Sequence, residues 1–251
     1  MLGDLVLEIT RALTAAAPPP LALPYLGMDH PTDTGFHLLD GLSARGIFRK
    51  YELVLALGDG LGASARWLAA RLGCEVVATA AADEAAAGGA LSRRTALAAQ
   101  VRHVAADPGA LPVGAARFTH VWIVEALPRC PDAAAALAEA HRALRPGGTL
   151  AVQDLVRAPG APPVAVAGWR FADLAARIAA VAAAGFVEVD ARDVSADAGE
   201  RSARVTAART LLLRRAGDDA ELAALVAERT ALAAGRAAGG LRVVQILARR
   251  P

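Results

Sequence analysis

Short apolar runs alternate with longer amphipathic segments along this chain from residue 52 onward. The apolar runs predict seven strands, at 52–57, 75–79, 101–105, 120–124, 149–153, 186–190 and 242–248. Between them apolar residues recur at steps of three and four, which predicts helices over 63–72, 84–100, 132–144 and 171–184. This alternation is typical of a parallel sheet covered on both faces. The predicted fold class is therefore α/β, a Rossmann-like, seven-stranded and mostly parallel sheet with helices on both faces.

The first fifty residues precede this alternation. An amphipathic helix is predicted to end at the prolines 18–20, which lack amide donors. A polar, glycine-bearing stretch (27–35) and a short helix through Leu38 and Leu42 follow. We expect residues 1–50 to form an N-terminal helical leader. It is either a lid over a ligand site or a surface cap that closes the end of the sheet.

A second departure lies before the last predicted strand. Residues 200–240 carry two long helical patterns that are split near Gly217, and Asp218 or Asp219 is expected to cap the second helix. We interpret the segment as a two-helix insertion within a domain that spans residues 51–251. Its helices either shape a substrate pocket or a dimer contact, or they only pack against the sheet.

Composition narrows the function classes. The chain has 251 residues, of which 55% are apolar, and a formal net charge of +2 with scattered arginines. It has enough apolar residues for a core and lacks the basic stripe of a nucleic-acid-binding protein. Cys74 and Cys130 are too few for a disulfide framework, which suits a cytoplasmic protein, and we expect no metal. Charged residues interrupt the first apolar run, so neither a signal peptide nor a membrane partner is expected.

A glycine turn follows the first predicted strand and opens the first helix of the alternation. Gly58, Gly60 and Gly62 occupy alternate positions, which lets the backbone turn sharply and approach a ligand closely. With Ala63 the turn also fits the relaxed dinucleotide fingerprint, so a nicotinamide-dependent oxidoreductase is one hypothesis. That hypothesis lacks the ribose-binding acid expected about twenty residues further on.

Two further motifs occur in a fixed order with this turn. Residues 60–68 form the turn and helix start, 124–127 the end of the fourth strand, and 145–148 (Arg-Pro-Gly-Gly) the entry into the fifth. Together they resemble the class I S-adenosylmethionine-dependent methyltransferases, in particular the small-molecule branch with sarcosine/dimethylglycine and tocopherol-type enzymes. The resemblance implies a methyltransferase that acts on a small, largely apolar metabolite, with S-adenosylmethionine as its cofactor.

The resemblance also implies a cofactor site across the carboxyl ends of the first strands. Gly58, Gly60 and Gly62 would face the methionine portion, and Asp107 would accept a hydrogen bond from the adenine amino group. Glu125, at the end of the fourth strand, is assigned to the same site. The alternative for Asp107 is a cap of the loop before Pro108.

Two positions depart from the family pattern. Ala56 and Ala80 stand where the family has acids, the second of which would hold the ribose hydroxyls. Asp59 adds a carboxylate within the turn, which would either contact the sulfonium or amino group or repel the methionine carboxylate. Asp83 is expected to cap the helix that begins at Glu84. An alternative function follows: a catalytically inactive relative that has lost the cofactor and serves as a ligand-binding or partner subunit.

Candidates for a catalytic base are Glu125, Asp154, His30 and His37, at strand ends or in the leader. Asp154 has an alternative role as a cap after the fifth strand. The acid and histidine that relatives carry after the fourth strand are replaced by residues 128–130 (Pro-Arg-Cys), so no base is carried over from the family. The expected partner is a small-molecule substrate. A homo-oligomer or partner protein stays open.

Overall fold

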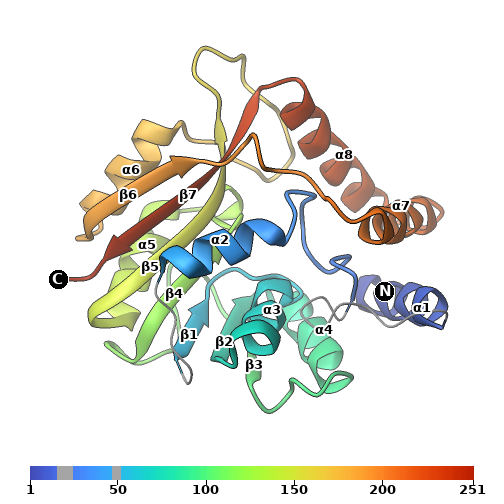
Figure 1. The fold of residues 1–251 in the computed structure, drawn as a ribbon, viewed down its shortest axis with the longest axis horizontal. Helices are drawn as coiled ribbons and strands as arrows, with labels where there is room; N and C mark the ends of the chain where they lie inside the picture. The colour runs from blue at the N-terminus through green and yellow to red at the C-terminus, as the bar shows by residue number, and fades with distance from the viewer. Residues whose placement is uncertain (16–24, 47–51) are drawn as a thin grey trace.

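The computed structural model describes residues 1–15, 25–46 and 52–251. Within these residues seven strands form one sheet, in the order β3-β2-β1-β4-β5-β7-β6. The strands are β1 (Leu53–Ala56), β2 (Glu75–Ala80), β3 (Val101–Ala105), β4 (Phe118–Val124), β5 (Leu144–Arg157), β6 (Val187–Asp193) and β7 (Leu241–Arg249). Only β7 runs antiparallel to its neighbours (Figure 1). The predicted mostly parallel, seven-stranded sheet is confirmed.

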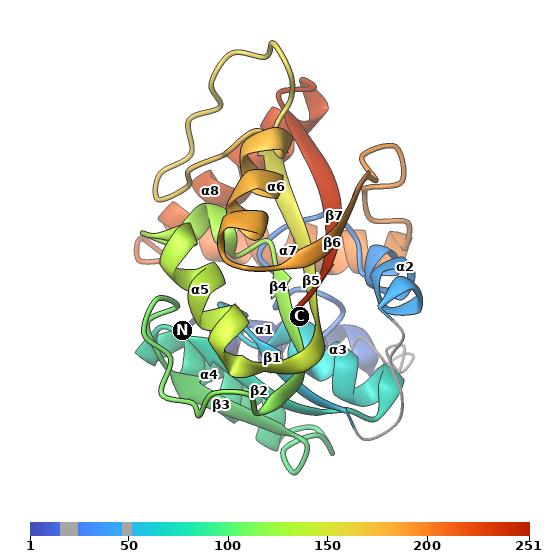
Figure 2. The same cartoon turned by 90° about the vertical axis from the view of Figure 1, so that its left-hand side faces the viewer.

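Helices cover both faces of the sheet. They are α1 (Leu2–Thr14), α2 (His37–Arg45), α3 (Ala63–Leu72), α4 (Ala82–Arg93), η1 (Leu127–Arg129), α5 (Ala133–Ala143), α6 (Leu174–Ala183), α7 (Ala203–Gly217) and α8 (Ala223–Ala237). α5 and α6 pack on one face, and α2 and α3 on the other (Figure 2). On the second face Trp67 stacks on Trp122 with ring centroids 6.0 Å apart, and both rings are buried. Burial of such large apolar side chains fixes the helices on the sheet.

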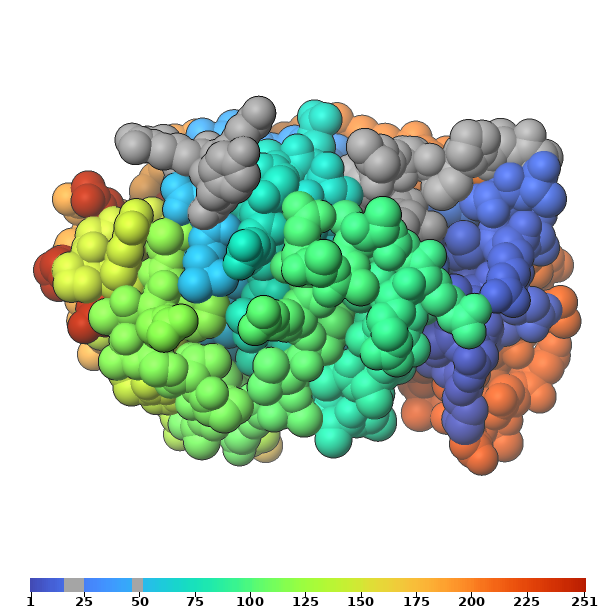
Figure 3. Space-filling view, turned by 90° about the horizontal axis from the view of Figure 1, so that it is seen from below, coloured from blue at the N-terminus to red at the C-terminus, as the bar shows by residue number. Residues whose placement is uncertain are grey.

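The leader packs against the insertion and not only against the sheet. Val6 and Ile9 of α1 are buried in one cluster with Leu212 of α7 and Leu91 of α4. Figure 3 shows the blue N-terminal helix lying against the orange segment that contains α7. Segments about 200 residues apart in the chain therefore share one core at the end of the molecule.

The parallel register brings several chain turns to one edge of the sheet. In β1, Leu55 pairs with Val77 of β2 on one side and Val121 of β4 on the other. The carboxyl ends of these strands consequently lie side by side. In sheets of this kind ligands bind at that edge, where the strand order reverses.

Several local predictions differ from the structure. The helix predicted over 84–100 is α4, which begins at Ala82 and ends at Arg93, because Thr95 bonds back to the Ser92 carbonyl oxygen through both its amide and its hydroxyl. Asp83 lies in the first turn of α4, and the N-cap is Ala81.

The structure confirms the two helices predicted for the insertion, but not the predicted cap. α8 begins after Leu222, and neither Asp218 nor Asp219 caps it. Asp219 instead accepts the amide of Glu221 at 2.8 Å and shapes the turn before the helix. The prolines 18–20 lie outside the described residues; the first helix itself ends at Thr14.

The described part of the chain has no helix long and apolar enough to cross a membrane. It also has no group of three or more His, Cys, Asp or Glu side chains placed to hold a metal ion. Cys74 and Cys130 are buried free thiols, and burial raises the pKa of each to about 11.

Candidate functional site

The glycine turn leaves β1 at the carboxyl edge and enters α3. Gly58, Gly60 and Gly62 all have positive φ, at 68°, 54° and 84°, a region that favours glycine. A Cβ at Gly58 would lie 2.8 Å from the Cβ of Ala126, and one at Gly62 would lie 2.2 Å from the ring of His103. Both backbone conformation and close approach therefore require glycine here.

Asp59, within the turn, faces the start of α3. One carboxylate oxygen accepts the amide and the hydroxyl of Ser64, at 3.2 and 2.6 Å, and the other accepts the amide of Ala65 at 2.8 Å. Burial raises the pKa of Asp59 to about 6, although these bonds oppose the shift. The side chain thus satisfies free helix amides, a role that differs from both expectations for a carboxylate in the turn.

A cavity of about 300 Å³, here called the turn cavity, lies beside the glycine turn. Its charged side chains are Glu84, Asp107 and Arg129; the rest of its lining is Gly58, Ala80, Ala81, Ala106, Pro108, Ala126, Cys130 and Pro131. Asp107 accepts the amide of Gly109 at 2.8 Å, as the alternative loop-cap role expects, and also borders the cavity. Gly58 and Asp107, assigned to one site from sequence, are brought together.

The two departures from the family pattern differ in position. Each is the last residue of its strand, Ala56 of β1 and Ala80 of β2, but of the two only Ala80 lines the turn cavity. Across that cavity the Glu84 carboxylate forms a 3.0 Å ion pair with the Arg129 guanidinium. The pair carried no signal in the sequence, since Glu84 is four residues beyond the expected acid and Arg129 stood out only as a departure from the family pattern.

Glu125 is not at the turn cavity. It is fully buried with a φ of 57°, and its carboxylate accepts hydrogen bonds from the Thr32 and Thr34 hydroxyls and, at 3.0 Å, from the Gln153 amide. The leader is anchored to the end of β4 through this carboxylate. The two threonines carried no signal in the sequence, because their partner is about ninety residues away.

Asp154 is also paired inside the protein. It lies within β5, not after it, and forms a 2.7 Å ion pair with Arg177 of α6, with both side chains buried. Burial raises the pKa of Asp154 to about 7, against the opposing effect of the guanidinium. The alternative role of Asp154, a cap after the fifth strand, is wrong, since the strand continues to Arg157.

The two leader histidines lie away from the turn cavity. His30 is buried edge-on to the Phe36 ring, with 5.0 Å between centroids, and burial lowers its pKa. The Nε2 atom of His37 is 2.8 Å from the carbonyl oxygen of Asp197 and donates to it. His30 is thus part of the leader's packing, and His37 joins the leader to the segment before α7.

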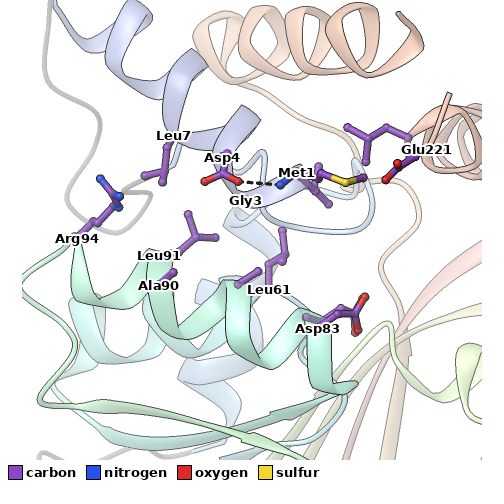
Figure 4. A pocket seen from close by; sticks show the side chains of 14 residues that line it. Met1, Gly3, Asp4, Leu7, Leu61, Asp83, Ala90, Leu91, Arg94 and Glu221 are labelled. Carbon is purple, nitrogen blue, oxygen red and sulfur yellow. Dashed lines mark hydrogen bonds and ion pairs between the residues drawn. The ribbon is translucent and has the colours of Figure 1, made fainter. Parts of the chain in front are cut away.

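A second cavity, of about 580 Å³, lies between α1 and α4 and is here called the helix cavity (Figure 4). Apolar side chains, including Leu7, Leu61 and Leu91, project into it from the leader, the glycine turn and α4. Asp4, Asp83, Arg94 and Glu221 also line it. Glu84 lines both this cavity and the turn cavity, so the two cavities share one residue.

A sheet with a reversed seventh strand, and a glycine turn opening onto a cavity at its carboxyl edge, define the class I S-adenosylmethionine-dependent methyltransferase fold. Residues 55–152 match the family described as "Methyltransferase domain". This segment, 98 of the 251 residues, is thus similar to methyltransferase domains.

Curated methyltransferases are also similar to parts of the chain. The chain is 37% identical over 134 residues to a malonyl-[acyl-carrier protein] O-methyltransferase of Enterobacter lignolyticus, covering 53% of this chain and 50% of the relative. It is 34% identical over 104 residues to methyltransferase GfsG of Streptomyces halstedii, covering 41% and 37%. The chain thus spans half or less of the length of these relatives.

Solved structures share the whole fold. The [4+2]-cyclase SpnF superposes with a TM-score of 0.74 at 20% identity, over 99% of this chain and 93% of its own. A protein from Galdieria sulphuraria assigned as a sarcosine dimethylglycine methyltransferase superposes with a TM-score of 0.69 at 17% identity, over 90% and 86%. The leader and insertion are therefore included in the similarity.

Proposed function

We propose that this protein binds S-adenosylmethionine in the turn cavity and transfers its methyl group to a small, largely apolar molecule. The observation that carries the proposal is the turn cavity itself, open beside a glycine turn at the carboxyl edge of the sheet. Nucleotide-type ligands bind at this position in doubly wound sheets. The match of residues 55–152 to a methyltransferase domain supports the same cofactor.

The residues present fit the cofactor. Small side chains at Ala80, Ala81 and Ala106 leave room for a flat purine, and about 300 Å³ lies at the lower end of the usual range for ligand pockets, ~300–1,000 Å³. The Asp107 carboxylate on its edge is of the type that accepts a hydrogen bond from the adenine amino group. The fit therefore holds although Ala56 and Ala80 offer no acid.

The chemistry requires an acceptor held in line with an electrophilic methyl group. When bound, the cofactor supplies that methyl on its sulfonium. None of the four candidate bases (His30, His37, Glu125 and Asp154) is among the described residues that line either cavity. We therefore assign the chain a positioning role, in which the glycine turn fixes the cofactor and the helix cavity holds the acceptor beside it.

The helix cavity supports an acceptor that is small and largely apolar. Its floor is made by leucines of α1, the glycine turn and α4, and Leu61 comes directly from the turn that would face the methionine portion. Apolar lining of this kind favours apolar ligands, because binding removes their surface from water. The proposed methyl-transfer site is where the two cavities meet, at Glu84.

Two experiments test the proposal. Calorimetry measures the binding of S-adenosylmethionine and S-adenosylhomocysteine, and a turnover assay measures the formation of S-adenosylhomocysteine from S-adenosylmethionine in the presence of a panel of apolar acids, amines and phenols. Gly58→Ala is expected to abolish binding, because its Cβ would meet Ala126 at 2.8 Å. Gly41→Ala is the matched control, since a Cβ there meets nothing within 4 Å. The turnover assay is needed because one protein of this fold is a cyclase.

Absence of binding by either ligand at millimolar concentration would refute the proposal and favour the inactive alternative. In that case Ala56→Asp with Ala80→Asp would restore affinity if acids were lost from a former site. A charge-assisted hydrogen bond contributes about 1.5–3 kcal/mol, so the expected gain is at least tenfold.

A further inference from the structure

We propose that Glu84 and Arg129 are the polar cofactor anchors of this chain, taking the place of the acids missing at Ala56 and Ala80. Glu84 is assigned to the ribose hydroxyls and Arg129 to the methionine carboxylate. The inference rests on the proposed function and adds to it two residues that neither the family match nor the relatives assign. The ion pair that they form without ligand would then be exchanged for contacts with the cofactor.

Both side chains occupy the right place. They line the turn cavity from opposite elements, Glu84 from the first turn of α4 and Arg129 from η1 after β4. A Cβ built on Gly60 would lie 3.5 Å from the Glu84 carboxylate and 3.9 Å from the Arg129 guanidinium. The ion pair is thus directly over the glycine turn, where a bound cofactor would pass.

The two groups are held in position yet remain reachable. Glu84 lies at the N-terminal end of a helix, where the peptide dipoles stabilise a carboxylate. The Arg129 guanidinium is 6.0 Å from the ring centroid of Trp169, a distance at which cation and ring attract. Their side chains are 30% and 33% exposed, so each can exchange its partner for a ligand group.

The assignment to ligand groups follows from chemistry and topology. A carboxylate accepts bonds from hydroxyls, and in doubly wound sheets an acid after the second strand holds the ribose. Glu84 is the acid that this cavity has on the β2–α4 side. A guanidinium donates two parallel bonds to a carboxylate, which makes Arg129 the complement of the methionine carboxylate.

Two ligands separate the two roles. S-adenosylhomocysteine carries ribose, adenine and the amino-acid end, whereas 5′-methylthioadenosine has no amino-acid end. Glu84→Gln is expected to lower the affinity for both ligands about tenfold, with Glu84→Asp retaining part of it. Arg129→Gln is expected to lower the affinity for S-adenosylhomocysteine about tenfold, while that for 5′-methylthioadenosine stays within about twofold or rises.

The matched controls are Glu8→Gln and Arg215→Gln. These residues form an exposed ion pair of 2.9 Å between α1 and α7, so their loss tests the removal of a similar pair elsewhere. Dissociation constants are measured by calorimetry, with thermal unfolding to show that each variant folds. Unchanged affinity in Glu84→Gln, or an equal loss for both ligands in Arg129→Gln, overturns the inference. If the parent binds neither ligand, the proposed function fails and the inference with it.

Discussion

At the residue scale, carboxylates near the site have been directed inward by the fold. Asp59 accepts helix amides, Glu125 holds the leader and Asp154 pairs with Arg177. Each had been a candidate for binding or catalysis because its type and position suited that chemistry. The sequence places an acid near a strand end, but the direction of its side chain depends on partners elsewhere in the chain.

The cap formed by Asp59 leads to a pH prediction. Asp59→Ala removes the cap of α3, which costs ~1–2 kcal/mol of unfolding free energy. The folded pKa of about 6 is above the ordinary value of an aspartate, 3.8, so folding binds a proton between these values. The stabilising effect of Asp59 is therefore largest below pH 4 and falls as pH rises toward 6. The difference in unfolding free energy between parent and variant, measured in urea, should shrink over that interval.

Asp132→Ala is the control, because Asp132 caps α5 with an exposed carboxylate. If the difference in unfolding free energy from the parent declines equally for both variants, the burial of Asp59 is not the cause of the decline.

At the scale of elements, the leader is joined to β4 by a buried polar contact. Thr32 and Thr34 give their hydroxyl hydrogens to Glu125, whose remaining described partner is the Gln153 amide. A buried carboxylate that loses hydrogen bonds is left without compensation for its lost hydration. The contact therefore determines how firmly residues 25–36 close this edge of the sheet.

Replacing both threonines by valine is expected to destabilise the protein by about 2–3 kcal/mol, since a charged group loses two hydrogen bonds at nearly constant side-chain volume. Amide hydrogen exchange in residues 25–36 should accelerate, whereas exchange in β4 and β5 should change little. Thr210→Val is the control, because that hydroxyl is exposed on α7 and bonds within its own helix. Unchanged protection of the leader in the double variant would show that other contacts hold it.

At the scale of the whole molecule, the two cavities can be tested separately. Ala90→Phe places a ring in the helix cavity, whose lining includes Ala90, and leaves the turn cavity untouched. We expect saturable binding of the uncharged apolar dye Nile red to weaken about tenfold, the effect of ~1.4 kcal/mol, while S-adenosylhomocysteine binds as before. Ala86→Phe, on the exposed side of α4, serves as control. Equal dye binding by all three proteins would exclude the helix cavity as the apolar site.

Much of the architecture could be predicted from the sequence, because strand and helix periodicity are local properties. All seven strands were found, and α3 was predicted at its observed bounds, Ala63–Leu72. The glycine turn was visible for the same reason. Contacts between distant segments were not visible in the sequence. One of them is the Glu84–Arg129 pair, which spans 45 residues. Neither cavity could be derived, since each is lined by at least three elements.

The joining of leader and insertion has a consequence for synthesis on the ribosome. Arg209 and Arg229 donate to the carbonyl oxygens of Gly27 and Met28, and Arg236 pairs with Asp33. These arginines are made about 200 residues after the groups they bind, and closing so long a loop is slow. The leader emerges first, and its contacts with α4 and β4 can form well before those with α7 and α8. The nascent chain can therefore complete strands β1 to β5 before the contacts between leader and insertion form.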